Sequence, residues 1–273
     1  MLSYPNCKIN LGLNIIGKRA DGFHNLETVF YPIAIKDAVE IITTDRFSDI
    51  TFTSTGKTIN VKEENNICVK GYHLLKKDYP QIGNIKMHLH KNIPIGAGMG
   101  GGSTDATAVL LMLNKQFSLQ LSQEKLTAYA LQLGSDCPFF IINKPCFASS
   151  RGEILEEINV NLSDNKILIV NPSIHINTGN AFGELNPQNF SSAGQLRNVI
   201  SKDIYEWKHI LKNDFEVPVF AKHPCIKEIK DTLYNNGAIY SAMSGTGSTV
   251  YGIFKNEINL NIKFPSHYFC QFV

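Results

Sequence analysis

The stretch Pro94-Ile95-Gly96-Ala97-Gly98-Met99-Gly100-Gly101-Gly102-Ser103-Thr104 contains the residue types that suggest chemistry most directly. Glycines occupy most positions from 96 to 102, and the apolar run that follows is typical of a helix. A bare backbone can approach an anion closely and direct several N–H groups at it. A helix starting at the end of the loop adds the positive end of its dipole. The stretch therefore predicts a phosphate-binding loop, with a flexible turn as the alternative.

Two widespread nucleotide-binding motifs do not account for this loop. The pattern G-x-G-x-x-G fits Gly96, Gly98 and Gly101, but a dinucleotide fold needs an acidic residue after a second strand, about 20 residues on. Residues 119–122, Leu-Gln-Leu-Ser, open another helix instead. A P-loop needs a lysine after its last glycine, where this chain has Gly102. The positive partner of the phosphates must therefore be a metal ion or a distant lysine.

Lys8, Asn10 and Asp136 are the further candidates for chemistry. Lys8 and Asn10 share one face of an expected strand, since side chains alternate along it, and an exposed strand face is the alternative explanation. Asp136 lies in a Ser-Asp-Cys-Pro turn, where a turn-stabilising role is the alternative. A carboxylate can deprotonate a hydroxyl, a lysine can offset charge, and a phosphate loop with Mg²⁺ can hold a triphosphate. Together they form a minimal set for phosphoryl transfer.

The elements that must position these residues mix strands and helices without a regular β-α-β repeat, which favours an α+β fold. Strands are expected in the first forty residues and over 38–44, 49–53, 85–90, 139–142, 166–170, 238–242 and 249–254. Helices are expected over 66–75, over 104–114 with Ser103 as N-cap, over 123–133 with Ser122 as N-cap, and over 224–234. Residues 171–195 are expected to form a long loop, and a domain boundary is expected near 150–165.

Composition excludes several classes of protein. The 273 residues include 26 basic and 24 acidic side chains, a net charge of +2, which argues against a strongly basic nucleic-acid binder. The apolar fraction of 43% excludes a disordered chain. The longest apolar run, 108–113, is far shorter than the roughly 20 residues of a membrane span, and residues 1–6 do not resemble a signal peptide. Six scattered cysteines without a CxxC pair suggest a reducing compartment. We expect a cytoplasmic enzyme that binds neither nucleic acid nor membrane; no protein partner is indicated.

Four segments together resemble the GHMP kinases, small-molecule kinases named for galactokinase, homoserine kinase, mevalonate kinase and phosphomevalonate kinase. Residues 94–104 are similar to the family signature P-x-G-x-G-L-G-[GS]-[GS]-S-[SA], and residues 243–250, MSGTGSTV, resemble the third family motif. Two segments resemble one branch whose substrate carries cytidine: residues 8–11 followed by RADGFH at 19–24, and LGSDCPFF at 133–140. These matches keep the family order and span residues 8–254.

The resemblance implies a two-domain α+β kinase. Residues 1–157 would form an ATP-binding domain similar to ribosomal protein S5 domain 2, and residues 158–273 a ferredoxin-like domain. It implies phosphorylation of a small-molecule hydroxyl by ATP with Mg²⁺, on a substrate with a cytidine diphosphate handle. The implied catalytic residues are Lys8 and Asp136. The implied ATP-binding residues are Pro94, Ile95, Gly96, Ala97, Gly98, Met99, Gly100, Gly101, Gly102, Ser103 and Thr104, with Ser103 as a candidate Mg²⁺ ligand. The implied substrate-binding residues are Asn10, Phe23, His24, Thr178 and Phe182.

The chain departs from the family pattern at two positions. Phe23 stands where tyrosine is frequent, and Asp105 stands where asparagine or alanine is usual. Asp105 would suit the start of a helix, but it would repel ATP if it faced the phosphates. Another GHMP kinase, such as a homoserine kinase, is the second hypothesis, although RADGFH would then have no nucleobase to bind. An inactive regulatory protein is the third, disfavoured because Lys8 and Asp136 are both present. Residues 183–220 match no motif.

Overall fold

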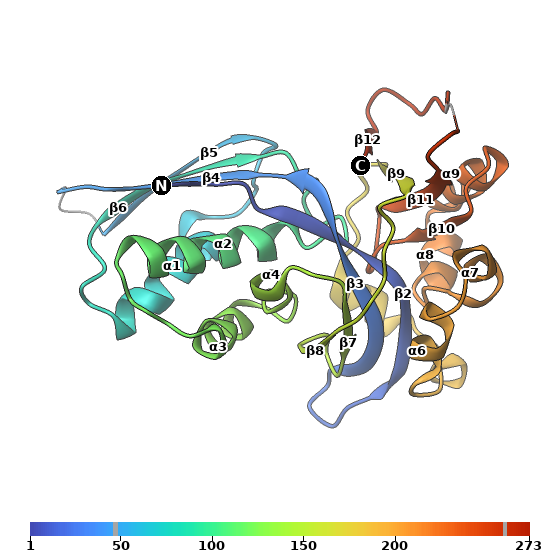
Figure 1. Cartoon of the computed structure of the whole chain (residues 1–273), viewed down its shortest axis with the longest axis horizontal. Helices are drawn as coiled ribbons and strands as arrows, with labels where there is room; N and C mark the ends of the chain where they lie inside the picture. The colour runs from blue at the N-terminus through green and yellow to red at the C-terminus, as the bar shows by residue number, and fades with distance from the viewer. Residues whose placement is uncertain (46–48, 259–260) are drawn as a thin grey trace. The chain divides into compact units, whose positions relative to one another are not determined.

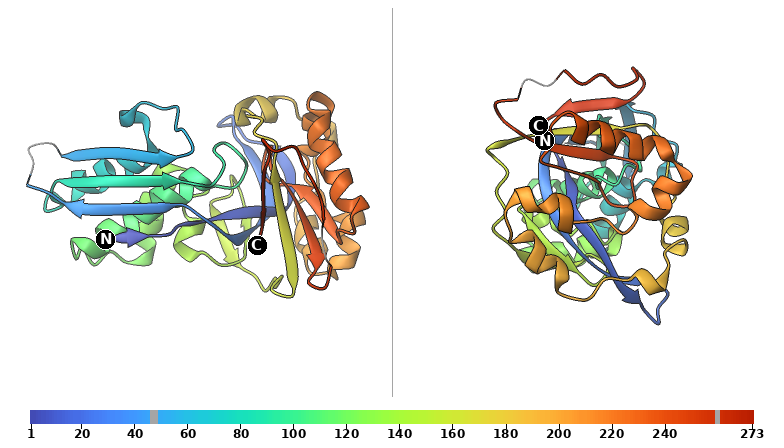
Figure 2. Two further views of the ribbon diagram at one scale, coloured as in Figure 1. Left: turned by 90° about the horizontal axis from the view of Figure 1, so that it is seen from above. Right: turned by 90° about the vertical axis from the view of Figure 1, so that its right-hand side faces the viewer.

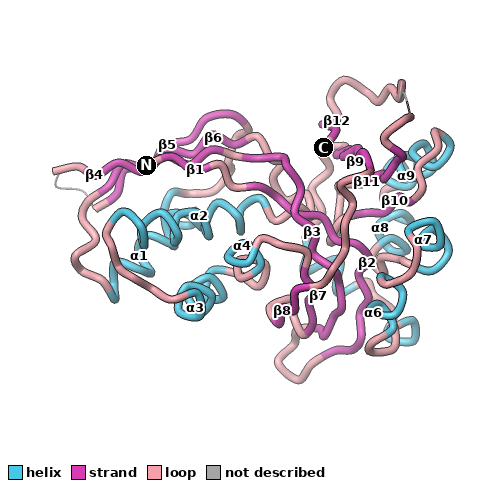
Figure 3. The backbone as a smooth tube through the Cα atoms, in the orientation of Figure 1, coloured by secondary structure: helices cyan, strands magenta, loops and turns pink. Residues whose placement is uncertain are grey.

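The computed structural model describes residues 1–45, 49–258 and 261–273, which form two compact units (Figures 1 and 3). Unit 1 consists of residues 1–7, 34–95 and 100–143, and unit 2 of residues 8–33, 96–99 and 144–273. Because the chain passes between the units several times, neither is a continuous stretch, and the boundary between residues 157 and 158 stays a prediction. None of the described helices is long and apolar enough to cross a membrane.

Unit 1 is a four-stranded sheet with helices on one face (Figure 2). Its strand order is β1 (Leu2–Ser3), β4 (Ala38–Thr43), β6 (Ile85–Lys91) and β5 (Ile50–Gly56), with only the β5–β6 pair parallel. Its helices are η1 (Glu63–Asn65), α1 (Ile67–Asp78), α2 (Gly101–Gln116), α3 (Gln123–Leu133) and α4 (Phe139–Ile142). The alternating residues of β6 and the apolar faces of α1 and α2 form one core, in which Met87, Tyr72 and Leu110 are buried.

N-cap residues were predicted for two helices of unit 1, and the structure confirms one of them and not the other. Ser122 is the N-cap of α3, as predicted, and its side chain accepts a hydrogen bond from the Lys125 backbone N–H. Ser103 is not the N-cap of α2, because it lies inside the first turn of that helix. Gly100 is the N-cap instead, with φ +67, a left-handed conformation that glycine adopts without strain. The helix therefore starts earlier than the sequence pattern predicted.

The strand predicted over residues 139–142 is wrong, because these residues form the short helix α4. Four consecutive apolar residues carry no period and fit a buried strand or a buried helix equally well. Pro138 already has helical backbone angles, and Asn143 ends the helix with φ +51. The local backbone preferences at the two ends decide the outcome.

Unit 2 contains two further four-stranded sheets. The first has the order β2 (Asn6–Lys18), β3 (His24–Lys36), β7 (Cys146–Ser149) and β8 (Ile154–Glu157). The second has the order β10 (Tyr240–Met243), β11 (Val250–Lys255), β9 (Asn165–Asn171) and β12 (Phe269–Phe272), antiparallel throughout. The helices are α5 (Thr178–Gly183), η2 (Pro187–Asn189), α6 (Gln195–Ile200), α7 (Ile204–Ile210), α8 (Glu216–Lys222) and α9 (Pro224–Asn235). The α+β class predicted from the sequence is confirmed.

The long loop predicted over residues 171–195 is wrong in part, because it contains α5 and η2. Both begin at an asparagine, Asn177 and Asn186, whose side chain accepts a hydrogen bond from a backbone N–H. Helices this short cannot show a hydrophobic period. By contrast, α9 lies where it was predicted, and its apolar face of Ile226, Ile229 and Leu233 is buried.

Candidate active site

Lys8 and Asn10 lie side by side on β2, within unit 2, and both are buried, with 3% and 2% of their surface exposed. The alternative of an exposed strand face is therefore wrong. The Lys8 Nζ donates hydrogen bonds to Asn10 Oδ1 at 2.6 Å and to the Gly98 carbonyl at 3.2 Å. Asn10 Nδ2 donates to Thr28 Oγ1, whose hydroxyl donates to the Gly12 carbonyl. This chain of bonds fixes the Asn10 oxygen toward the ammonium, and so fixes the lysine charge.

The part of the glycine loop that belongs to unit 2, residues 96–99, runs along this strand. The Lys8 backbone N–H donates to the Met99 carbonyl at 3.1 Å. Gly98 has φ +76, and a Cβ added there would collide with the Ser244 carbonyl. Only glycine combines this backbone conformation with so close an approach. The need for glycine at position 98 is therefore set by a neighbouring backbone.

Ser244, which sequence reasoning did not single out, completes this cluster in unit 2. It is fully buried, and its Oγ donates to the Gly98 carbonyl at 2.8 Å. The same oxygen accepts a hydrogen bond from the Asn10 backbone N–H at 3.1 Å. The signal was present in the sequence, because Ser244 lies in the MSGTGSTV segment, but spacing along the chain could not say which of its residues would reach Lys8 and Asn10.

Gly100, Gly101, Gly102, Ser103 and Thr104 belong to unit 1, where they form the N-cap and first turn of α2. The Thr104 N–H donates to the Gly100 carbonyl, while the preceding N–H groups lie at the start of the helix, where no earlier turn accepts them. The α2 helix has 16 residues, so its N-terminus carries a dipole that favours an anion. This geometry suits a phosphate group.

Asp105, the departure from the family pattern, is buried in a cluster with Lys91 and Asp37. It is 1% exposed and accepts a hydrogen bond from Lys91 Nζ at 2.6 Å. Lys91 also donates to the buried Asp37, which in turn accepts the backbone N–H groups of Asn92 and Ile93. Burial, together with the neighbouring Asp37 carboxylate, raises the pKa of Asp105 to about 8 against the attraction of Lys91. The Asp105 carboxyl is therefore paired with Lys91 inside the protein, and its burial favours the neutral form.

Asp136 lies half-buried in the turn between α3 and α4, also in unit 1. The next residue, Cys137, is fully buried, and its carbonyl accepts a hydrogen bond from Thr107 Oγ1 of α2 at 3.0 Å. The Cys137 N–H donates to the Gly134 carbonyl, which closes the turn. Burial raises the pKa of the Cys137 thiol to about 11, so the thiol stays neutral. Asp136 is thus next to a residue that is fixed to α2 through Thr107.

His24 and Phe182 form a ring pair in unit 2. The His24 imidazole stacks on the Phe182 ring with centroids 4.9 Å apart and an interplanar angle of 20°. Phe190, which sequence reasoning missed, contacts the His24 ring edge-on at 6.1 Å. Burial and the nearby Lys18 lower the pKa of His24 from its ordinary value of 6.5, so the imidazole is neutral at pH 7. A neutral imidazole can both donate and accept a hydrogen bond.

The Phe23 side chain is 53% exposed, and its ring contacts the Arg151 guanidinium, 4.9 Å from the ring centroid. The turn that carries it is held by Asp21, which accepts the Phe23 N–H, and by Arg19, which donates to Ser150 Oγ. The remaining predicted substrate residue, Thr178, lies 3.3 Å from Thr246 between hydroxyl oxygens. Unit 2 therefore brings Thr178 to the same glycine-rich turn as Ser244.

The predicted residues thus fall into two sets. Unit 2 holds Lys8, Asn10, Phe23, His24, residues 96–99, Thr178 and Phe182, and unit 1 holds Pro94, Ile95, residues 100–104 and Asp136. Among the residues that the structure describes, no group of three or more His, Cys, Asp or Glu side chains is arranged to hold a metal ion. The role of Ser103 toward Mg²⁺ stays a prediction.

Comparison with known proteins shows two family matches and a set of close relatives. Residues 66–144 match the GHMP kinases N terminal domain and residues 195–261 match the GHMP kinases C terminal domain. The chain is 47% identical over 259 residues to a protein of Bacteroides thetaiotaomicron, covering 94% of this chain and 93% of the relative. It is 40% identical over 268 residues to a protein of Porphyromonas gingivalis, covering 96% and 94%. Both relatives are named 4-diphosphocytidyl-2-C-methyl-D-erythritol kinase.

Solved structures show the same fold. A crystal structure of 4-(cytidine 5'-diphospho)-2C-methyl-D-erythritol kinase superposes with a TM-score of 0.79 at 27% identity, covering 93% of this chain and 90% of the other. The mevalonate kinase of Methanococcus jannaschii superposes with a TM-score of 0.66 at 15% identity, covering 94% and 91%. The second likeness shows the fold alone. The GHMP kinase fold predicted from the sequence motifs is confirmed.

Proposed function

The chain belongs to the GHMP kinases, within the family of 4-diphosphocytidyl-2-C-methyl-D-erythritol kinases, and from this membership we propose how its residues act on that substrate. The reaction transfers the γ-phosphoryl group of ATP to the 2-hydroxyl of 4-diphosphocytidyl-2-C-methyl-D-erythritol and releases ADP. It serves the non-mevalonate route to isoprenoid precursors. The observation that carries the cytidine specificity is the His24–Phe182 ring pair. The cytoplasmic location is part of the proposal, and six free cysteine thiols support it.

The glycine loop and the start of α2 bind the ATP phosphates in this proposal. The backbone N–H groups at the start of α2 that have no partner in an earlier turn face the phosphates, and the helix dipole attracts the negative charge. Mg²⁺ takes oxygen ligands and is usually bound through one or two protein oxygens and the phosphates themselves. The Ser103 hydroxyl in the first turn of α2 fits that requirement, while Asp105 is occupied by Lys91. When bound, the ion neutralises phosphate charge.

Asp136 and Lys8 carry the chemical step. Asp136 accepts the proton of the substrate 2-hydroxyl. The oxygen of that hydroxyl can then attack the γ-phosphorus. Lys8 holds a positive charge whose position is fixed by Asn10 Oδ1 and the Gly98 carbonyl. Charge held in advance stabilises the developing negative oxygen at no cost of reorganisation. The proposal requires both side chains to act on the same hydroxyl group.

The cytosine base is bound by aromatic faces and by the imidazole. The Phe182 ring offers a stacking surface, and stacking of a base on an aromatic ring contributes about 1–3 kcal/mol. Neutral His24 supplies a hydrogen-bond donor and an acceptor for the edge of the base. Phe23 supplies a second, exposed ring that lacks the hydroxyl of tyrosine but keeps the stacking face. Asn10 and Thr178 line the polyol and phosphate part of the substrate.

The test is ADP release by the purified chain with ATP and Mg²⁺. Three acceptors are compared: 4-diphosphocytidyl-2-C-methyl-D-erythritol, the same polyol phosphate without cytidine, and homoserine. We expect turnover with the first acceptor only. Turnover with homoserine would overturn the cytidine specificity while leaving the kinase class in place. ATP binding without turnover on any acceptor would favour a regulatory protein instead.

A further inference from the structure

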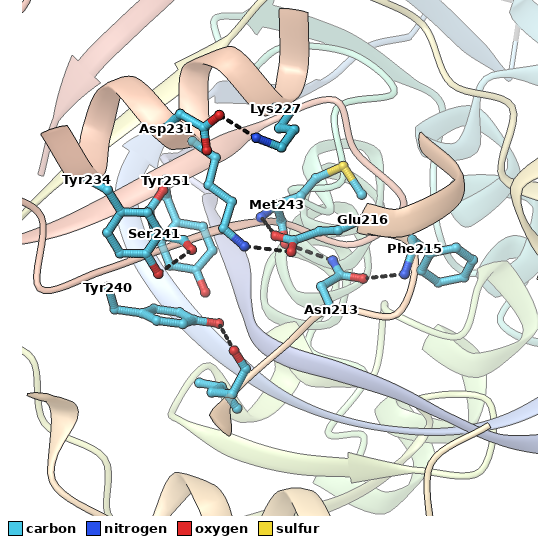
Figure 4. A network of polar contacts seen from close by, with 12 residues as sticks. Asn213, Phe215, Glu216, Lys227, Asp231, Tyr234, Tyr240, Ser241, Met243 and Tyr251 are labelled. Atoms are coloured by element: carbon cyan, nitrogen blue, oxygen red, sulfur yellow. Dashed lines mark hydrogen bonds and ion pairs between the residues drawn. The ribbon is translucent and has the colours of Figure 1, made fainter. Parts of the chain in front are cut away.

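Asn213 comes from the part of the chain, residues 183–220, that no sequence motif explains. It is 2% exposed and lies between α7 and α8 in unit 2, where its backbone pairs with Leu13 of β2. Its Nδ2 donates a hydrogen bond of 2.8 Å to the Met243 carbonyl (Figure 4) and another of 2.8 Å to the Gly245 carbonyl. These two carbonyls flank Ser244. Asn213 Oδ1 accepts the Phe215 N–H at 2.9 Å, so the amide can face in one direction only.

Glu216 also binds the backbone of this turn. It is 8% exposed, and its Oε1 accepts the Met243 N–H at 2.9 Å. Its Oε2 accepts a hydrogen bond from Lys230 of α9 at 2.6 Å, within the same network (Figure 4). Every polar atom of the Met243 backbone is thereby bound to a buried side chain of this network. Such buried bonds are costly to break, because the groups left behind cannot reach water.

The turn needs this support because of its composition. Gly245 and Gly247 have φ angles of +58 and +95, and glycine restricts the backbone less than any other residue. Between them and β10 lies Ser244, whose hydroxyl donates to the Gly98 carbonyl and accepts the Asn10 N–H. The Gly98 carbonyl is also an acceptor for Lys8 Nζ. A continuous chain of bonds thus runs from Asn213 through the Ser244 segment to Lys8.

We propose that Asn213 is a positioning residue for phosphoryl transfer: by holding the carbonyls on both sides of Ser244, it fixes the hydroxyl that sets the Gly98 carbonyl and the Lys8 ammonium. The inference rests on the proposed role of Lys8. Asn213 and Ser244 are 31 positions apart in sequence, and Asn213 reaches the Gly98 carbonyl and Lys8 only through the Ser244 segment. A purely structural role, attaching the α7–α8 connection to β10, is the alternative that the experiment must separate.

The experiment is a double-mutant cycle with Asn213→Asp and Ser244→Ala. Aspartate has the size of asparagine but places oxygens where the two carbonyls need donors, so it releases the turn without creating a cavity. We expect each single variant to lower kcat about 10- to 100-fold, since small misplacements of a catalytic group have effects of this size. The KM of the cytidylated substrate should stay within about twofold, because the His24–Phe182 pair is untouched. The double variant should be no slower than the slower single variant.

The control is Asn236→Ala, which removes another amide that donates to a backbone carbonyl, that of Thr232, at an exposed site. It should leave kcat unchanged. A lowered melting temperature of Asn213→Asp with wild-type kcat per folded molecule would overturn the proposal, as would effects that multiply in the double variant. If Asn213→Asp does not fold, Asn213→Ser, which keeps one donor, enters the same cycle with the same criteria.

Lys8→Met, measured alongside, separates this inference from the proposed mechanism. Turnover by Lys8→Met at the wild-type rate would overturn the role of Lys8 and, with it, the inference. Loss of turnover by Lys8→Met combined with multiplying effects in the Asn213–Ser244 cycle would overturn the inference alone. Loss of turnover together with a double variant no slower than its slower parent would support both.

Discussion

The Lys91 ammonium at the end of β6 donates a hydrogen bond to the Asp105 carboxylate, one turn into α2, with 2.6 Å between Nζ and Oδ2. Both side chains are almost fully buried, and Lys91 also binds Asp37. One cation and two carboxylates would leave a net negative charge in the interior, which burial opposes. Burial and the Asp37 carboxylate raise the pKa of Asp105, which favours a protonated Asp105 and a neutral cluster. The aspartate in the second turn of α2 is thus held inside the protein by Lys91.

We predict that the contribution of Asp105 to stability falls as pH rises. The pKa of Asp105 is raised in the folded chain to about 8 from an ordinary 3.8. Between these values the folded chain binds more protons than the unfolded chain, so the free energy of unfolding decreases with increasing pH, by at most about 1.4 kcal/mol per pH unit. Asp105→Asn should therefore gain stability relative to wild type from pH 5 to pH 8.5. Urea unfolding at both pH values measures this, and a difference independent of pH would contradict it.

Gly98→Ala should disrupt the loop, whereas Gly102→Ala should be tolerated by the fold. A Cβ at position 98 meets the Ser244 backbone at a positive φ, which cannot relax by rotation of a side chain. A Cβ at position 102 meets only a methyl group of Ile67 at 3.7 Å, within a helix, where alanine is favoured. We expect Gly98→Ala to lose about 2 kcal/mol or more of unfolding free energy. The measurement is the melting temperature of each variant. Equal melting temperatures for Gly98→Ala and Gly102→Ala would contradict the prediction.

Asp136→Asn should lose most turnover while keeping ATP affinity within a few fold. Removal of a general base typically costs about 10²–10⁴ in rate, and asparagine retains the size of the side chain. Asp164→Asn, at an exposed site of unit 2, serves as the matched control and should keep the wild-type rate. The measurement is kcat from ADP release together with the dissociation constant of ATP. A near wild-type kcat for Asp136→Asn would remove the general base from the mechanism.

His24→Ala and Phe182→Leu should raise the KM of the cytidylated substrate about tenfold and leave the KM of ATP within twofold. An increase in KM of about tenfold is the size expected when a base loses one stacking or hydrogen-bond partner. Tyr205→Leu, which removes an exposed aromatic ring of α7, is the control. Equal increases in both KM values would show that these residues do not bind cytosine.

The same site has an expected pH dependence. Burial and Lys18 lower the pKa of His24 from 6.5, so the neutral imidazole persists at neutral and alkaline pH. Protonation removes the acceptor nitrogen that reads the base. The KM of the cytidylated substrate should therefore be constant above pH 6.5 in the wild type and increase only below it. The His24→Ala variant should lack that increase.

The elements that the sequence predicted well are those whose ends carry local signals. Ser122 caps α3 through a bond to its own third neighbour, and Gly134 ends it, so both boundaries depend on nearby residues alone. The strand predicted over 139–142 and the N-cap predicted at Ser103 were wrong where the local pattern was ambiguous. Four apolar residues carry no period, and the Gly100 backbone conformation made a serine cap unnecessary.

The chemistry available to this protein could be read from its sequence: a glycine loop before a helix, an aspartate in a turn, a lysine on an expected strand and the RADGFH segment, in the order of one kinase family. Only the tertiary structure decided where those groups point. It buried Lys8 against Asn10 Oδ1 and the Gly98 carbonyl, paired Asp105 with Lys91, and joined Asn213 to the turn around Ser244. Hydrogen bonds between residues tens of positions apart depend on how whole strands and helices pack. Local sequence patterns do not specify that packing, so they could not predict these bonds.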